Sequence, residues 1–239
     1  MPGMPAGGGA WALAELRRAV NAELRSNSYL LAQPGMLDAG TPCVVIDPGL
    51  DHAAMDAVLE QTGWMPEAVI CTHGHFDHIG GAARLQTKYQ IPVYLRAPDA
   101  KQAKLSNFLM AAFKVPGKVE QPDFSLLQEA TPEVQAAGRC FALHALPGHT
   151  PGSAGVLVDG MLFSGDSLYA SRVGLSRLPG ENHAQLRASL HGLFSWIPSQ
   201  TLVFPGHGEH ATIATILRSN QELKAFMADT TALEMQSPT

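Results

Sequence analysis

One short segment of this 239-residue chain carries three histidines and an aspartate, and it constrains the fold and chemistry more than any other feature. A β-type run, Ala68–Cys71, leads almost directly into His73, His75, Asp77 and His78. Because residues two positions apart point to the same side of an extended backbone, His73 and His75 can share one ion. Asp77 and His78 follow where the chain is expected to turn into a helix. Four ligand-type side chains so close together crowd a single ion, so the segment predicts two neighbouring ions.

The same arrangement, a β-type run followed by a glycine turn and a ligand-type residue, occurs three more times. These turns supply His149, Asp166 and His207 from separate strand ends. Two metals with one bridging ligand need about seven ligands, and the chain offers five histidines and two aspartates in compatible places. Neutral imidazole suits zinc or iron, and carboxylate broadens the choice to manganese. We therefore expect two divalent metal ions per chain, with Zn as the first choice and Fe or Mn as the alternatives.

Short β-type runs bounded by Gly, Pro, Asp or Asn alternate with helical patterns along the rest of the chain. Two helical faces follow residues that can cap a helix, Asp51 and Asn182, and further helices are expected at Pro98–Phe113 and Ile213–Met227. The segment 12–25 has no assignable pattern. Strands in both halves with dispersed helices predict a layered α/β fold of two packed sheets with helices outside. The expected strands are Tyr29–Leu31, Val44–Asp47, Ala68–Cys71, Val93–Leu95, Cys140–Leu146, Gly155–Val158, Met161–Ser164 and Thr201–Phe204.

Composition excludes several classes of protein. Sixteen Lys and Arg against 21 Asp and Glu leave a formal net charge of −5, which argues against nucleic-acid binding through bulk positive charge. No apolar run approaches the roughly 18 residues of a membrane span, so no membrane association is expected. Three cysteines without CxxC spacing argue against a disulfide framework. Residues 1–10 lack the features of a signal peptide, so we expect a flexible N-terminus, one domain over 11–239 and a cytoplasmic location. The oligomeric state stays open.

Taken together, these motifs resemble the metallo-β-lactamase superfamily, and within it the glyoxalase II-like (hydroxyacylglutathione hydrolase-like) branch. The resemblance runs in order from about residue 27 to residue 220. It implies an αββα sandwich of two facing mixed β-sheets flanked by helices, with the metals at one edge of the sheets. Asp166 stands at the position where the antibiotic-hydrolysing branch has a cysteine. The segments that carry the resemblance are Asn27-Ser-Tyr-Leu-Leu31, Val45-Ile-Asp-Pro-Gly49, Thr72-His-Gly-His-Phe-Asp-His-Ile-Gly80, Pro147-Gly-His-Thr-Pro-Gly-Ser153, Ser164-Gly-Asp166 and Pro205-Gly-His-Gly208.

The resemblance also implies a function, metal-dependent hydrolysis of a small-molecule substrate by a hydroxide that bridges the metals. Two metals can share a water and depress its pKa toward neutrality, and the chain has no Gly-x-Ser-x-Gly elbow for a serine nucleophile. Asp77 can also orient the nucleophile, which makes it a candidate catalytic residue. A small thioester such as S-lactoylglutathione is the first expected substrate. The implied ligands are His73, His75 and His149 for one metal, Asp77, His78 and His207 for the second, and Asp166 as the bridge.

One departure from the glyoxalase II-like pattern bears on the substrate. Leu175 stands where that branch carries a basic residue that assists glutathione binding, and Arg172 or Arg177 can compensate for it. Arg218 begins an Arg-x-Asn run that resembles one in shorter relatives, so Arg177 and Arg218 are candidate substrate-binding residues. Tyr169 is a candidate residue of the pocket wall.

Three alternatives to the thioesterase remain open at this point. The first is a lactone or other ester hydrolase of the same fold, which the absent cation favours. The second is a persulfide dioxygenase-like enzyme with a single iron held by His73, His149 and Asp166. The third is a non-catalytic metal-binding module, against which the complete ligand set argues.

Overall fold

The first half of the chain forms a six-stranded mixed sheet. The computed structural model describes residues 13–129, 131–176 and 178–228, so the expected flexible segment 1–10 lies outside the described residues. The strand order is β1-β2-β3-β4-β5-β6. Neighbours pair antiparallel from β1 to β3 and parallel from β3 to β6. The strands are β1 (Leu16–Val20), β2 (Asn27–Ala32), β3 (Pro42–Ile46), β4 (Met65–Ile70), β5 (Val93–Arg96) and β6 (Phe124–Leu127).

The second half forms another six-stranded sheet, in the order β12-β11-β10-β9-β8-β7. All its neighbours are antiparallel except β10 and β11, which pair in parallel. The strands are β7 (Glu133–Ala136), β8 (Arg139–Ala145), β9 (Ala154–Val158), β10 (Met161–Gly165), β11 (Leu202–Pro205) and β12 (Ala211–Thr212). The two sheets and their order along the chain agree with the expected αββα sandwich.

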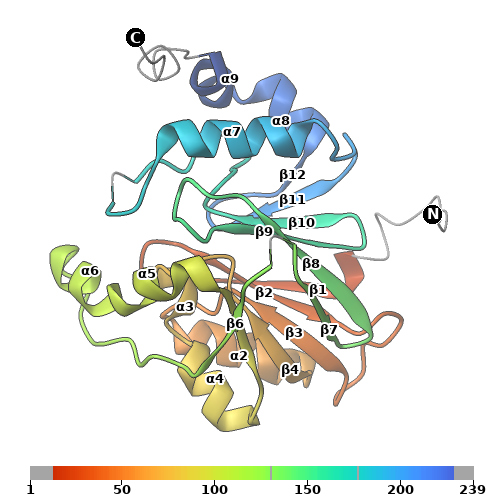
Figure 1. Ribbon diagram of the computed structural model, residues 1–239. Helices are drawn as coiled ribbons and strands as arrows, with labels where there is room; N and C mark the ends of the chain where they lie inside the picture. Colours follow the sequence, from red (N-terminus) through yellow and green to blue (C-terminus); the bar gives the residue numbers. More distant parts are fainter. Residues whose placement is uncertain (1–12, 130, 177, 229–239) are drawn as a thin grey trace.

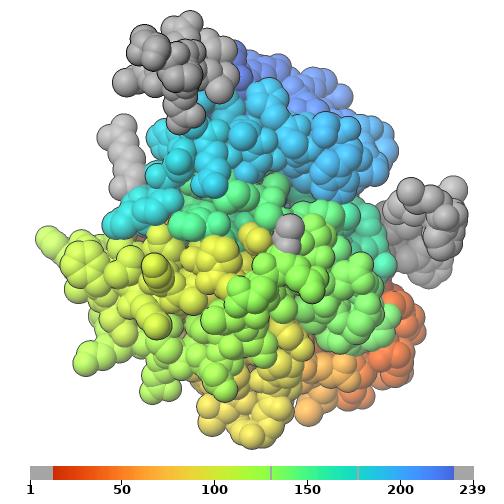
Figure 2. Space-filling model, in the orientation of Figure 1, coloured from red at the N-terminus to blue at the C-terminus, as the bar shows by residue number. Residues whose placement is uncertain are grey.

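Helices cover the outer face of each sheet (Figure 1). The helices α2 to α6 lie on the side of the first sheet, and α7, α8 and α9 lie over the second. Figure 2 shows the same layers at the surface, with the blue C-terminal helices at one end of the molecule and the yellow and orange segments at the other. Within the described residues, no helix is long and apolar enough to cross a membrane. The helices are α2 (His52–Thr62), α3 (Phe76–Ile79), α4 (Ala82–Tyr89), the 3-10 turn η1 (Ala97–Asp99), α5 (Ala100–Lys104), α6 (Ser106–Ala112), α7 (His183–Phe194), α8 (Ile213–Ser219) and α9 (Gln221–Ala228).

Three apolar clusters hold the four layers together, and the strand alternation explains how one strand serves two of them. Leu30 on β2 packs toward the helices of the first half, whereas its neighbour Leu31 packs between the sheets. The cluster between the sheets also takes Phe141 and Phe163 from the second sheet. The third cluster joins that sheet to α7, α8 and α9 through residues such as Leu190.

Several local predictions agree with the structure. Asp51 and Asn182 cap α2 and α7, since their side-chain oxygens accept the amide hydrogens of Ala54 and Gln185 at 3.0 Å. All eight expected strands are present with shifts of a few residues at their ends.

Two helix predictions and one unassigned segment need correction. The single helix expected over Pro98–Phe113 is broken into η1, α5 and α6. At the break between α5 and α6, the amide of Leu105 donates to the carbonyl of Gln102, three residues back, and the hydroxyl of Ser106 donates to the carbonyl of Ala103. The helical pattern over 213–227 is two helices, α8 and α9, divided at Asn220. The unassigned segment 12–25 contains β1.

Candidate metal centre

The loop after β4 brings its four ligand-type residues to the sheet edge in two pairs. His73 and His75 precede α3, and Asp77 and His78 lie within it, all four buried. His75 is extended, with ψ 148°, so the change of direction into the helix separates the pairs as expected. No residue with a side chain fits at Gly74 without a shift of the backbone, because a Cβ there would lie 2.8 Å from the amide nitrogen of Ala103.

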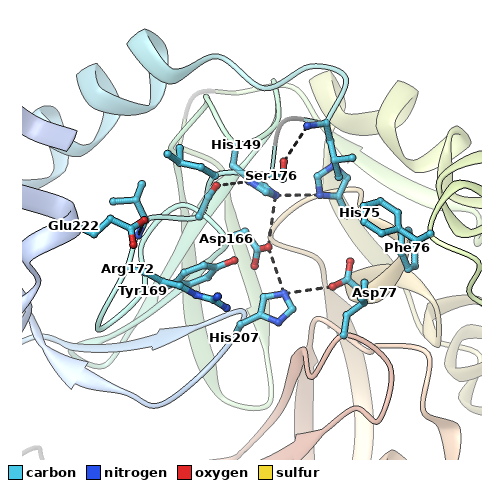
Figure 3. Close-up of a pocket in the computed structure, with 16 residues that line it drawn as sticks. His75, Phe76, Asp77, His149, Asp166, Tyr169, Arg172, Ser176, His207 and Glu222 are labelled. Carbon is cyan, nitrogen blue, oxygen red and sulfur yellow. Dashed lines mark hydrogen bonds and ion pairs between the residues drawn. The ribbon is translucent and has the colours of Figure 1, made fainter. Parts of the chain in front are cut away.

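Three other strand ends deliver the remaining candidates to the same place. His149 lies in the loop after β8, Asp166 directly follows β10, and His207 follows β11. In Figure 3, Asp166 lies at the centre, with His149 and His75 on one side and His207 and Asp77 on the other. All seven predicted ligand residues therefore converge, although they come from both sheets.

Ligand-type atoms are grouped around the Asp166 carboxylate. Its Oδ2 lies 3.6 Å from Nε2 of His149 and 3.5 Å from Nε2 of His207, and its Oδ1 lies 3.3 Å from Nε2 of His78. Oδ2 of Asp77 lies 3.4 Å from Nε2 of His207. Two atoms that each bind one tetrahedral ion at about 2.1 Å are about 3.4 Å apart. In the described part of the chain, three sets of three residues have ligand atoms within 4.8 Å of one another: His73, His75 and His149; Asp77, His78 and His207; and Asp47, His73 and His78.

Several buried ring nitrogens and one carboxylate oxygen of these residues form no hydrogen bond within the part of the chain that the structure describes. Nε2 of His73, His75 and His78, and Oδ1 of Asp166, are buried and form no hydrogen bond among the described residues. Buried polar atoms are normally satisfied, so this concentration at one place needs an explanation. A metal ion provides one, because imidazole nitrogens and carboxylate oxygens are the usual protein ligands of zinc. The residues present therefore fit a divalent metal.

The outward-facing nitrogens are, in contrast, held by the protein. Nδ1 of His149 lies 2.9 Å from the carbonyl oxygen of Gly174, an acceptor, so Nδ1 donates a hydrogen there, and Nε2 of the same ring lies 3.0 Å from Nδ1 of His75. Nδ1 of His78 lies 3.0 Å from a carboxylate oxygen of Asp47. Such outer partners fix the tautomer and the orientation of a metal-binding imidazole.

Two buried aspartates support the ligand loops, and the sequence prediction gave neither a role. Asp47 accepts hydrogen bonds from the amide and the hydroxyl of Thr72, both at 2.7 Å, besides facing His78. The sequence feature that could have indicated this role of Asp47 is its position directly after β3, in the Val45–Gly49 run. Asp99 accepts the amide hydrogens of Gly74 at 2.7 Å and Gly152 at 2.6 Å and the hydroxyl of Thr150 at 2.7 Å. It thereby joins the His73–His75 loop to the His149 loop.

The electrostatics separate the site into a neutral part and a charged part. Burial lowers the pKa of His73, and it lowers the pKa of His75 to about 3, so both imidazoles are neutral. Burial also acts against protonation of His207, but the carboxylates of Asp166 and Asp77 outweigh it and raise the pKa to about 9. The pKa values of the two aspartates are lowered in turn, since the neighbouring histidines outweigh the effect of burial. A divalent cation would take the place of those imidazole protons.

An open pocket of about 540 Å³ lies over the centre, and Asp77, His149, Asp166 and His207 line it. Tyr169 lines it as predicted, and burial and the charge of Asp166 raise the pKa of its phenol well above the ordinary value. The rest of the wall is largely apolar, and its apolar residues are Leu24, Phe76, Phe113, Val173, Leu175 and Leu178.

The predicted arginines are placed differently. Arg218 is exposed on α8 and is not among the described residues that line the pocket. Arg177 lies outside the described residues. Arg172 does line the pocket, with its guanidinium 5.1 Å from the ring centroid of Tyr169.

Sequence comparisons agree with this geometry. A family model described as the metallo-beta-lactamase superfamily matches residues 22–207. The chain is 30% identical over 218 residues to "Probable metallo-hydrolase YqgX" of Bacillus subtilis (strain 168), covering 88% of this chain and 98% of that protein. It is 36% identical over 163 residues to "Hydroxyacylglutathione hydrolase" of Alkalilimnicola ehrlichii, covering 68% of this chain. This match spans 55% of the hydroxyacylglutathione hydrolase.

Solved structures lead to the same family. The structure of "BLEG-1 B3 metallo-beta-lactamase" matches with a TM-score of 0.76 and 27% sequence identity, covering 90% of this chain and 100% of that chain. The structure of "TTHA1623 in a di-iron-bound form" matches with a TM-score of 0.74 and 31% identity, covering 86% and 98%. With its two facing sheets and the histidines and aspartates that meet at their edge, this chain belongs to the metallo-β-lactamase superfamily.

Proposed function

We propose that the chain is a dinuclear metal-dependent hydrolase that cleaves a small thioester such as S-lactoylglutathione. One observation carries the proposal: buried imidazole and carboxylate atoms that lack hydrogen-bond partners meet around Asp166 beneath an open pocket of about 540 Å³. Asp166 is the shared ligand, because its carboxylate approaches histidines of both groups. In this proposal His73, His75 and His149 hold one metal, and Asp77, His78 and His207 hold the second.

The donor set decides which metals suit the site. Five imidazoles and two carboxylates suit zinc, with iron and manganese as alternatives. The relative described in a di-iron-bound form supports both the two-metal site and iron. When bound, the ions supply Lewis acidity and a water of lowered pKa next to the scissile carbonyl.

The chain's own residues prepare the substrate. Tyr169 lines the pocket beside Asp166, and a phenol keeps its proton at neutral pH, so its hydroxyl is placed to donate a hydrogen bond to the substrate carbonyl oxygen. Asp77 lines the pocket, and its carboxylate accepts a hydrogen bond from the attacking water and orients it. Phe76 and Phe113, whose ring centroids lie 6.1 Å apart, form an apolar wall that excludes bulk water from the acyl group.

The thioester is supported by the hydroxyacylglutathione hydrolase relative, at 36% identity. One observation favours a second candidate, a lactone or other ester hydrolase of the same fold. Leu175 lines the pocket with an apolar side chain at the position where the glyoxalase II-like branch carries a cation. A neutral ester needs no such cation.

A hydrolysis panel tests these candidates. The protein is freed of metal, reconstituted with zinc, iron or manganese, and assayed with glutathione thioesters, lactones and β-lactams. The thioesters are expected to give the highest kcat/KM, with about two metals per chain at full activity. Preferred turnover of lactones would move the assignment to the second candidate. Full activity of the metal-free protein, or no hydrolysis of any class, would overturn the proposal.

A further inference from the structure

A second cavity, of about 300 Å³, adjoins the pocket over the metal centre. Leu24, Arg172 and His207 line both cavities, so the two adjoin at these three residues. In Figure 3, Arg172 and Tyr169 reach toward His207 from the side opposite Phe76. A substrate bound at the centre can therefore extend past His207 into the second cavity.

The charged residues that line this second cavity are mostly arginines. Arg18, Arg25 and Arg172 line it together with one carboxylate, Glu209. Arg18 is engaged, because it donates hydrogen bonds to Glu209 at 2.9 Å and to the carbonyl of Gly208 at 3.1 Å. No hydrogen bond or ion pair joins the guanidinium of Arg25 or Arg172 to another described residue, and that of Arg172 lies over the ring of Tyr169. Both guanidinium groups can therefore take an anionic partner, in a chain whose formal net charge is −5.

The backbone places Arg25 beside the metal centre. Leu24 and Arg25 both have left-handed backbones, with φ of 54° and 55°, which side-chain-bearing residues rarely adopt. Consecutive residues in this region are retained where the surroundings determine them, often at functional sites. Here the next residue, Ser26, determines them: it donates a hydrogen bond to the carbonyl of Asp77 at 2.8 Å and pairs with His207 in an isolated bridge. The backbone of Arg25 is thereby held at the rim of the second cavity, with its side chain exposed.

We propose that this second cavity binds an oxyanion at one end of the substrate, through Arg25 and Arg172. A guanidinium matches a carboxylate or a phosphate with two parallel hydrogen bonds, so either anion fits. The hydrolysable bond then lies at the metal centre, and the apolar part of the substrate lies against Phe76 and Phe113. The inference rests on the proposed hydrolase function and narrows its substrates to esters or thioesters with an anionic end.

Binding of uncleavable thioethers tests the site without hydrolysis. The probes are alkyl thioethers with spacers of different length that end in a carboxylate, a phosphate or a neutral carboxamide, titrated calorimetrically into the metal-loaded protein. At one spacer length at least, an anionic probe is expected to bind about ten-fold more tightly than its carboxamide, because a charge-assisted pair forms at an exposed site. The better of the carboxylate and the phosphate identifies the anion.

Variants assign the preference to the two arginines. The double variant Arg25→Gln, Arg172→Gln is expected to bind the anionic and neutral probes equally. Arg17→Gln is the matched control: Arg17 neighbours Arg18 on β1 but lies 5.0 Å over Trp64 and lines neither cavity, so the preference should persist. Equal binding of both probes at every spacer length, or a preference retained by the double variant, would overturn the inference.

Hydrolysis of the matching thioesters separates this inference from the proposed function. An anionic thioester is expected to have about ten-fold higher kcat/KM than its carboxamide, a difference that the double variant loses. If no thioester is cleaved while the thioether preference persists, the hydrolase proposal fails and the oxyanion site stands. If both thioesters are cleaved equally, the hydrolase proposal stands and the oxyanion site fails.

Discussion

Replacing Asp99 by asparagine removes one of the two acceptor oxygens that hold the ligand loops together. In the native structure one carboxylate oxygen accepts from Gly74 and Thr150, and the other accepts from Gly152. An amide keeps one oxygen and turns an NH₂ group toward the remaining donor. Because Asp99 is fully buried, at 0% exposure, no water replaces the lost acceptor. Leaving one backbone N–H unsatisfied and weakening the other bonds costs about 3 kcal/mol of unfolding free energy.

Urea denaturation and metal titration of Asp99→Asn measure this effect. A loss of about 3 kcal/mol corresponds to a fall in Tm of about 6–12 °C for a chain of this size. Since Asp99 joins the His73–His75 loop to the His149 loop, metal affinity is expected to fall by about 10- to 100-fold. Asp123→Asn is the control, an exposed aspartate, and it should change stability by less than about 0.5 kcal/mol. An Asp99→Asn protein as stable as this control, with unchanged metal affinity, would refute the reasoning.

Three further outcomes are expected. Asp166→Ala should abolish hydrolysis and lower the bound metal measured by elemental analysis, with an unchanged circular dichroism spectrum; full turnover would rule out Asp166 as the shared ligand. Tyr169→Phe should lower kcat by about 100-fold with unchanged metal content, because one donor to the carbonyl oxygen is lost; unchanged kcat would remove Tyr169 from the reaction. Zinc at 100 times its Kd should stabilise the metal-free protein by about 2.7 kcal/mol in thermal melts; no shift in Tm would contradict binding to the folded state.

The strands that sequence patterns predicted are the interior strands of the two sheets, and the four they missed are the edges. β1, β6, β7 and β12 each end a sheet. Their residues are largely exposed or half-buried, whereas β2 is buried at every position. An edge strand has a partner on one side only and needs no continuous apolar run, so hydrophobic periodicity carries little signal there.

The position of a side chain could be predicted where its residue follows the end of a strand. The seven ligand candidates follow strand ends, and the structure brings all of them together. Asp99 had no such signal, because its role depends on contacts with Gly74 and Gly152, which lie far from it in the sequence. The role expected for Arg218 came from the resemblance of its Arg-x-Asn run to one in shorter relatives, and the structure leaves Arg218 outside the pocket. Long-range packing, which sequence periodicity does not encode, decides both cases.

The division of the ligand candidates between the two sheets has a consequence for assembly. Each proposed metal group takes two residues from the first half of the chain and a third, His149 or His207, from the second. Fragments separated in the connection between β6 and β7 would each contain an incomplete group. Such fragments should reassociate more strongly when zinc is present, because each ion would bind residues of both fragments. Zinc-dependent reassociation would then report complementation of a split polypeptide.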